Sequence, residues 1–202
     1  GIIAIDLDEG DHLIGAAITD GHHDVMLFSD AGKAVRFEED DVRSMGRATR
    51  GVRGMMLEPG QQVIAMLVAA DESLSVLTAT EHGFGKRTKG MIAIQTSERN
   101  GKVVGAVLVD ARDEVMLISN AGVLIRTRVA DVREMGRATQ GVTLISLDAG
   151  THLAGIEKIG ETEEDADALA EGVDAEEAGR DGAGEDGAGK DVSGPGPGES
   201  LH

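Results

Sequence analysis

Short apolar runs separated by polar turns fill the first 160 residues of the chain. Residues 25–28 are an apolar run, and a turn containing Gly32 separates them from the returning strand expected at 34–37, so this pattern predicts a β-hairpin. Glycine favours such a turn because it adopts positive φ angles that other residues adopt poorly. A polar loop follows, and further strands are expected at 51–57 and 63–68. Each unit of the pattern is therefore expected to contain four short antiparallel strands.

This unit occurs twice, at positions ninety residues apart. Residues 24–60 align with residues 114–150 without a gap, and the loop sequence GRAT at 46–49 recurs at 136–139. A long repeat period indicates an array of like units. Because the expected strands are short, evenly spaced and separated by glycine-containing turns, the repeat favours an all-β fold of propeller-like blades. A β-sandwich is the alternative.

A third, shortened copy lies between the two clean ones. Residues 75–87 match residues 24–36 at an offset of 51. The loop that comes next is about a dozen residues shorter than in the clean copies, and the gap falls between Thr88 and Lys89. The first five residues resemble the middle of a unit, so the sequence begins inside one. We therefore expect about three blades, one of them without its rim loop.

The composition of the chain limits where it can act. Its 202 residues are 41% hydrophobic, enough for a core, but include only three Phe and no Trp or Tyr. No apolar run approaches the roughly 20 residues that span a bilayer, and no signal peptide opens the sequence. The absence of Cys excludes disulfides and Cys-based metal sites. We expect a cytoplasmic protein with no membrane partner.

Most of the net charge of −18 lies at the end of the chain. Residues 161–202 contain fourteen acidic residues against Arg180 and Lys190, whereas residues 1–160 contain twenty-three acidic residues against seventeen Lys and Arg. The end is also rich in Gly and Ala, and it offers too little apolar surface to offset chain entropy. We therefore expect a folded domain at 1–160 and a disordered acidic tail at 161–202. The tail either solubilises the protein or competes with nucleic acid for a basic surface.

Positive charge in the folded part is concentrated in loops and at strand ends. If the units stack as blades, these positions share one rim. The expected nucleic-acid contacts are Arg36, Arg43, Arg47, Arg50, Arg53, Lys86, Arg87, Lys89, Arg126, Arg128, Arg133 and Arg137. Arg47 and Arg137, from the two GRAT loops, are expected to be the principal phosphate contacts.

A basic rim of this kind suits double-stranded DNA. Arginine side chains that contact phosphate release condensed counterions, which gives affinity without sequence choice. The absence of Tyr and Trp disfavours single-strand binding, which relies on aromatic side chains that stack on bases. The alternative is that the arginines pair with nearby acids such as Asp40, Asp41 and Glu134 in surface ion pairs, which contribute little.

The sequence offers little support for catalysis. It has neither a Cys nucleophile nor a phosphate-binding Gly-Lys-Thr loop. His22 and His23 lie beside Asp20 and Asp24, which could suggest a metal site, but a polar turn is the preferred interpretation. The acidic run at 38–41 is interpreted as a solvated loop rather than a general acid–base pair. We expect no catalytic residue, no metal and no cofactor in this chain.

Several long motifs resemble one known family. They are DVMLFSDAGKAVRF from residue 24, MGRATRGV and MGRATQGV in the two loops, TEHGFGKRT from residue 80 and ERNGKVVGAVLV from residue 98. In this order they resemble the carboxy-terminal domain of the A subunit of DNA gyrase, over about residues 1–158. That domain is a six-bladed β-pinwheel whose rim binds and wraps duplex DNA, so the resemblance implies a segment covering roughly its last three blades.

The resemblance also implies a larger assembly. The parent enzyme is a type II topoisomerase of two A and two B subunits that supercoils DNA in the bacterial cytoplasm, with ATP and Mg²⁺ bound in other domains or subunits. Its catalytic tyrosine lies in a separate domain, and its chief basic motif, the gyrase-A box, lies in the first blade, outside this sequence. The loops at 46–51 and 136–141 correspond to more divergent versions of that motif.

Three other functions compete with this interpretation. The equivalent domain of topoisomerase IV has a similar fold and fewer blades, although the ERNGKVVGAVLV stretch and the regular GRAT loops favour gyrase. A protein-interaction propeller would bind a partner protein at its rim without needing the loop arginines. A propeller enzyme would need a pocket with convergent acids or a metal.

Overall fold

The computed structural model describes residues 2–70, 73–89, 94–136 and 139–160. The chain divides into two units, Gly1–Gly160 and Glu161–His202. The second unit, and with it the prediction of a disordered acidic tail, lies outside the described residues.

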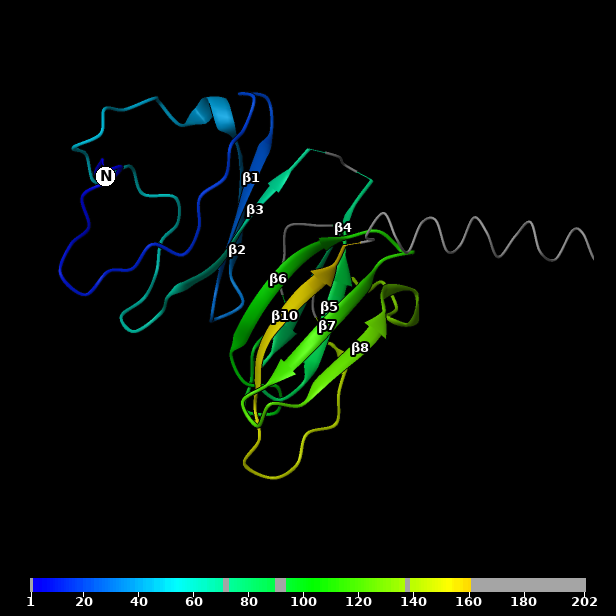
Figure 1. The fold of residues 1–202 in the computed structure, drawn as a ribbon. Helices are drawn as coiled ribbons and strands as arrows, with labels where there is room; N and C mark the ends of the chain where they lie inside the picture. Colours follow the sequence, from blue (N-terminus) through cyan, green and yellow to red (C-terminus); the bar gives the residue numbers. More distant parts are fainter. Residues whose placement is uncertain (1, 71–72, 90–93, 137–138, 161–202) are drawn as a thin grey trace, which may run out of the picture. The chain divides into compact units, whose positions relative to one another are not determined.

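The first unit contains three antiparallel sheets, one for each copy of the sequence repeat (Figure 1). The first sheet has the order β2-β1-β3, the second β6-β4-β5-β9 and the third β10-β7-β8. The strands are β1 (Asp24–Ser29), β2 (Ala34–Glu38), β3 (Val63–Ala69), β4 (Ser75–Thr80), β5 (Phe84–Thr88), β6 (Val103–Val109), β7 (Glu114–Ser119), β8 (Leu124–Arg128), β9 (Val142–Thr143) and β10 (Leu153–Ile159). The 3-10 helices η1 (Glu39–Asp41) and η2 (Val129–Asp131) follow β2 and β8. In the described part of the chain, no helix is long and apolar enough to cross a membrane.

Alternation along β4 gives the second sheet two apolar faces. Met26 and Phe28 of β1 are buried in a cluster with Val76 of β4, between the first and second sheets. Leu77, the next residue of β4, points to the opposite face and is buried with Leu117 of β7, between the second and third sheets. The core of the protein is therefore formed by packing between successive repeats, as expected of blades.

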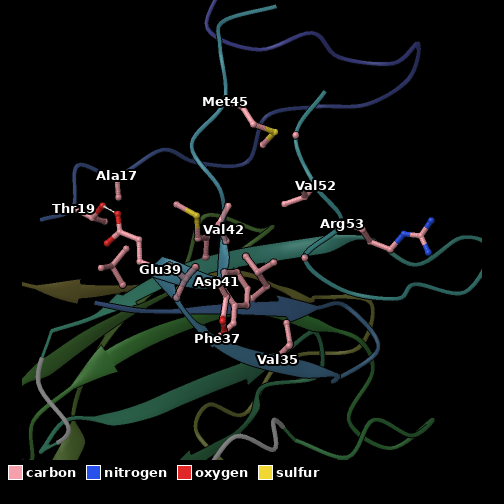
Figure 2. Close-up of a pocket in the computed structure, with 16 residues that line it drawn as sticks. Ala17, Thr19, Val35, Phe37, Glu39, Asp41, Val42, Met45, Val52 and Arg53 are labelled. Carbon is pink, nitrogen blue, oxygen red and sulfur yellow. Dashed lines mark hydrogen bonds between the residues drawn. The ribbon is translucent and has the colours of Figure 1, made fainter. Parts of the chain in front are cut away.

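The outer face of the first sheet borders an open cavity of about 600 Å³. Val25 and Leu27 of β1 line it together with Phe37 of β2 (Figure 2). The residues of β7 equivalent to the first two, Val115 and Leu117, are buried in the cluster shared with the second sheet. In the third repeat this face of the sheet packs against the preceding repeat, whereas in the first repeat the equivalent face borders the cavity.

The predicted all-β pinwheel-type fold is confirmed, but one strand differs from its predicted position. Residues 51–57 form no strand, and Val52 and Met56 are exposed. At the equivalent position of the third repeat, β9 hydrogen-bonds to β5 of the second repeat. A segment becomes a strand only where another edge accepts its backbone hydrogen bonds. The fourth strand of a repeat is therefore supplied to the sheet of the preceding repeat.

Contacts at the hairpin turns also join each repeat to the one before it. Gly83 has a φ of +80°, and its carbonyl accepts hydrogen bonds from the N–H groups of Leu144 and Ile145 at 2.8 and 3.2 Å. In the first hairpin the carbonyl of Ala31 accepts a bond from the hydroxyl of Thr96 at 3.1 Å. The segment after each rim loop thus lies on the hairpin of the preceding repeat. The rim loop that is shortened near Thr88 belongs to the second repeat, so its full-length equivalent would be expected over the first sheet.

Candidate nucleic-acid interface

The loop after β2 carries four arginines on an irregular backbone. Arg43, Arg47, Arg50 and Arg53 are all exposed. The loop bends at Arg47 and Ala48. The hydroxyl of Thr49 donates to the carbonyl of Gly46 at 3.0 Å, and the carbonyl of Thr49 accepts from the N–H of Asp6 at 3.1 Å. Glycine within the loop leaves the backbone open to close approach by a ligand.

The predicted contacts separate into three groups according to their partners. In the first group, the side chains are exposed and, within the described part of the chain, form no ion pair. These residues are Arg43, Arg47, Arg53, Lys89 and Arg133. Arg53 places its guanidinium 3.5 Å from Sδ of Met56. Arg137 lies outside the described residues, so its predicted contact stays a prediction.

Arginines of the second group pair with acidic side chains of their own repeat or of the N-terminal segment. Arg50 lies 2.7 Å from Asp8, and Arg128 lies 3.2 Å from Asp131. Arg36 pairs with Asp24, and Arg126 pairs with Glu114 at the equivalent position ninety residues later. The exposed pairs of Arg50, Arg126 and Arg128 contribute little to stability, so these arginines can exchange an acidic partner for a phosphate at small cost. The pair of Arg36 with Asp24 is half-buried.

Lys86 and Arg87 form the third group, and the structure corrects their placement. The sequence suggested an exposed strand end, but β5 lies between β4 and β9. Lys86 is fully buried, and burial lowers the pKa of its ammonium from the ordinary value of 10.5. Arg87 is half-buried and donates to the carbonyl of Val129 at 3.2 Å. Lys86 is therefore not at the surface, and Arg87 is partly exposed and bonded to a neighbouring loop.

Two other cations connect successive repeats. Lys102 pairs with Asp30 of the first repeat at 2.9 Å. Arg99 lies 4.6 Å from the ring centroid of Phe84 within its own, second repeat. Arg99 also donates to the side-chain oxygen of Gln140 at 3.5 Å. These inter-repeat roles were not predicted from the sequence, because they depend on contacts between segments far apart in the chain.

The turn before β1 brings together three groups of metal-ligating type. Ligand atoms of Asp20, His23 and Glu39 all lie within 4.8 Å of one another. Asp20 accepts a hydrogen bond from the N–H of His22 at 3.0 Å, and Glu39 accepts bonds from the hydroxyl of Thr19 and from the N–H of Gly21. Both carboxylates therefore hold the polar turn that the sequence suggested, with Glu39 rather than Asp24 completing the group.

Comparison with known families matches most of the described chain. The family of the DNA gyrase C-terminal domain, beta-propeller, matches residues 1–20, 23–70, 75–90, 85–110 and 113–159. These ranges include both GRAT loops.

Similar curated proteins are the A subunits of bacterial DNA gyrases. The chain is 51% identical over 191 residues to the DNA gyrase A subunit of Pseudomonas aeruginosa, covering 88% of this chain and 21% of that protein. It is 45% identical over 183 residues to the DNA gyrase A subunit of Escherichia coli, covering 84% of this chain and 21% of that protein. The chain thus spans about a fifth of the length of the relatives that it matches.

Solved structures with a similar fold come from two kinds of topoisomerase. A structure of a DNA gyrase A C-terminal domain has a TM-score of 0.70 and 29% identity, covering 79% of this chain and 58% of that one. A C-terminal domain of DNA topoisomerase IV has a TM-score of 0.72 and 22% identity, covering 86% of this chain and 57% of that one. At that lower identity, the second likeness shows the fold alone.

Proposed function

The chain belongs to the family of DNA gyrase C-terminal domains, and on this premise we propose that it is a non-catalytic segment that binds and wraps duplex DNA. The exposed arginines of the rim loops contact phosphates, and the surrounding sheets hold those loops in position. The observation that supports the proposal most directly is that Arg43 and Arg133, at equivalent positions of two repeats, are both exposed and, in the described part of the chain, outside any ion pair.

The proposed binding is electrostatic and independent of base sequence. Each arginine that contacts a phosphate displaces condensed counterions, so the affinity falls as the salt concentration rises. The loops carry no Trp or Tyr that could stack on bases. Paired arginines such as Arg126 and Arg128 can add contacts by exchanging their carboxylate partners for phosphates.

We infer that this segment belongs to a gyrase-like type II topoisomerase of two A and two B subunits that acts on DNA in the bacterial cytoplasm. ATP and Mg²⁺ would be bound by other domains or subunits of that enzyme, and a tyrosine outside this chain would cleave DNA. Gyrase is favoured over topoisomerase IV because the gyrase relatives reach 51% identity, whereas the topoisomerase IV likeness is one of fold.

The proposal is tested by titrating the full chain with linear duplexes of different sequence at several salt concentrations. We expect the logarithm of the binding constant to fall linearly with the logarithm of the salt concentration, by about 0.9 for each phosphate neutralised. Replacing Arg43, Arg47 and Arg133 together by Gln should weaken binding and flatten this dependence. A triple replacement of the acids Glu58, Asp110 and Asp148 by their amides is the matched control, and it should not weaken binding. Affinity without a salt dependence would exclude the phosphate mechanism.

A further inference from the structure

The arginine in the returning strand of each repeat has a partner that depends on the first residue of the preceding strand. In the first repeat that residue is Asp24, which pairs with Arg36, and in the third it is Glu114, which pairs with Arg126. In the second repeat the same position is Ser75. The strand before Arg87 therefore offers no carboxylate at the position that captures the equivalent arginines.

Arg87 instead binds the loop of the next repeat, defined here as the third-repeat loop, residues 129–136. Its guanidinium donates to the carbonyl of Val129 at 3.2 Å, at the start of that loop. Its own carbonyl accepts a hydrogen bond from the N–H of Met135 at 3.0 Å, near the loop's end. Between these two points the backbones of Arg87 and Glu134 form a parallel β-bridge.

Ser75 adds a third connection to the same loop. Its hydroxyl donates to Oε1 of Glu134 at 2.9 Å. Serine at this position therefore has two consequences: it offers Arg87 no carboxylate of the kind that Asp24 and Glu114 offer Arg36 and Arg126, and it binds a carboxylate of the third-repeat loop. An acid at position 75 would reverse both, because it would attract Arg87 and repel Glu134.

The loop held in this way carries Arg133, which is exposed and, in the described part of the chain, forms no ion pair. We propose that Arg87 is a positioning residue that, with Ser75, docks the third-repeat loop on the second sheet and so presents Arg133 to DNA phosphate. This inference rests on the proposed DNA-binding function for its consequence, but the docking itself is a property of the protein alone. Arg87 does not contact DNA in this arrangement, in contrast to the role expected from the sequence.

The docking is tested without DNA by hydrogen exchange on the full chain. In Arg87→Gln and Ser75→Asp variants, the Met135 amide should exchange about tenfold faster, a change that the loss of one charge-assisted hydrogen bond can produce. Core amides of β7 should exchange at the wild-type rate, which shows that the variants remain folded. Arg126→Gln, at the equivalent position of the third repeat, is the matched control and should leave Met135 unchanged. Wild-type exchange of Met135 in both test variants would overturn the docking role.

The consequence for binding is tested by a double-mutant cycle on duplex DNA. Arg87→Gln should weaken binding when Arg133 is present and have a much smaller effect when Arg133 has been replaced by Gln, because both changes act through one loop. Additive effects would contradict a positioning role and would make Arg87 a direct contact. If the chain showed no salt-dependent DNA binding at all, the proposed function would fail, while faster exchange of Met135 would still support the docking.

Discussion

Lys102 and Asp30 form an ion pair across two repeats, with Nζ of the lysine 2.9 Å from Oδ2 of the aspartate. Asp30 lies in the turn after β1, and Lys102 immediately precedes β6. The other carboxylate oxygen of Asp30 accepts the N–H of Gln62 at 3.0 Å, and its backbone carbonyl accepts the N–H of Val103 at 2.8 Å. One residue therefore joins two strands of its own sheet to the next sheet.

This arrangement predicts a loss of stability in acid. Burial alone would raise the pKa of Asp30, but the hydrogen bond from Gln62 and the ammonium of Lys102 outweigh burial and hold the pKa below its ordinary value of 3.8. A carboxyl group with a lowered folded pKa adds stability above its unfolded pKa and loses it as the pH falls through the folded pKa. The unfolding free energy should therefore decrease below about pH 4, and the decrease should be smaller in Asp30→Asn.

The same substitution should lower the unfolding free energy at neutral pH by about 1 to 3 kcal/mol. It replaces the buried carboxylate that accepts hydrogen bonds from Lys102 and Gln62 by a neutral amide. Urea unfolding monitored by circular dichroism measures the difference. Glu58→Gln is the control, since Glu58 pairs with Lys33 at the surface, and it should change the unfolding free energy by less than about 1 kcal/mol. Equal effects of the two substitutions would contradict the inter-repeat role of Asp30.

Gly83 and Gly122, at equivalent hairpin turns, should respond differently to alanine. Both have positive φ angles, of +80° and +79°, so alanine costs about 1 to 2 kcal/mol of backbone strain at either site. At Gly83 an added Cβ would also lie 2.4 Å from the carbonyl oxygen of Ile145, whereas at Gly122 it would meet no atom within 4 Å. Gly83→Ala should therefore cost a further amount of about 1 to 3 kcal/mol. Equal losses in thermal unfolding would mean that the third repeat does not pack on this turn.

Replacement of Lys86 distinguishes a buried side chain from one that contacts DNA. Because its ammonium is buried, Lys86→Met should leave DNA affinity and its salt dependence unchanged, unlike replacement of Arg133. Burial lowers the folded pKa of Lys86, so the unfolded state binds the proton more readily between that pKa and the ordinary value of 10.5. Wild-type stability should consequently rise with pH in this interval, and the rise should be absent in Lys86→Met. Weaker DNA binding with a reduced salt dependence in Lys86→Met would instead show that Lys86 contacts DNA.

Arg47 and Arg36 should separate binding from folding. Arg47 is exposed, so Arg47→Gln should change the unfolding free energy by less than about 0.5 kcal/mol and reduce the salt slope of DNA binding by about one. Arg36 is half-buried beside Asp24, and Arg36→Gln should cost about 1 kcal/mol of stability. Filter binding and urea unfolding on the same two proteins compare these effects. The assignment of Arg47 fails if its replacement changes stability but not binding.

Local sequence patterns were enough to predict the repeats, the hairpins and the family. Residues 24–37 and 114–127 carry their strands and turn in a local alternation of apolar and polar positions, with glycine where a positive φ is needed. These features depend on neighbours in the chain, so a single pattern predicts them. The exposed arginines of the GRAT-containing loop after β2 follow from the same reasoning, because polar loops between strands lie at the surface.

Which repeat completes which sheet is a property of the folded molecule alone. Residues 51–57 and β9 have related sequences, yet only β9 forms a strand, because only it meets the open edge of β5. Lys86 is buried and Arg87 is bonded to the third-repeat loop, although both lie in a motif that looks like an exposed basic strand end. Backbone hydrogen bonds between strands and the burial of side chains depend on residues that are distant in sequence, and a local sequence pattern does not predict which residues those are.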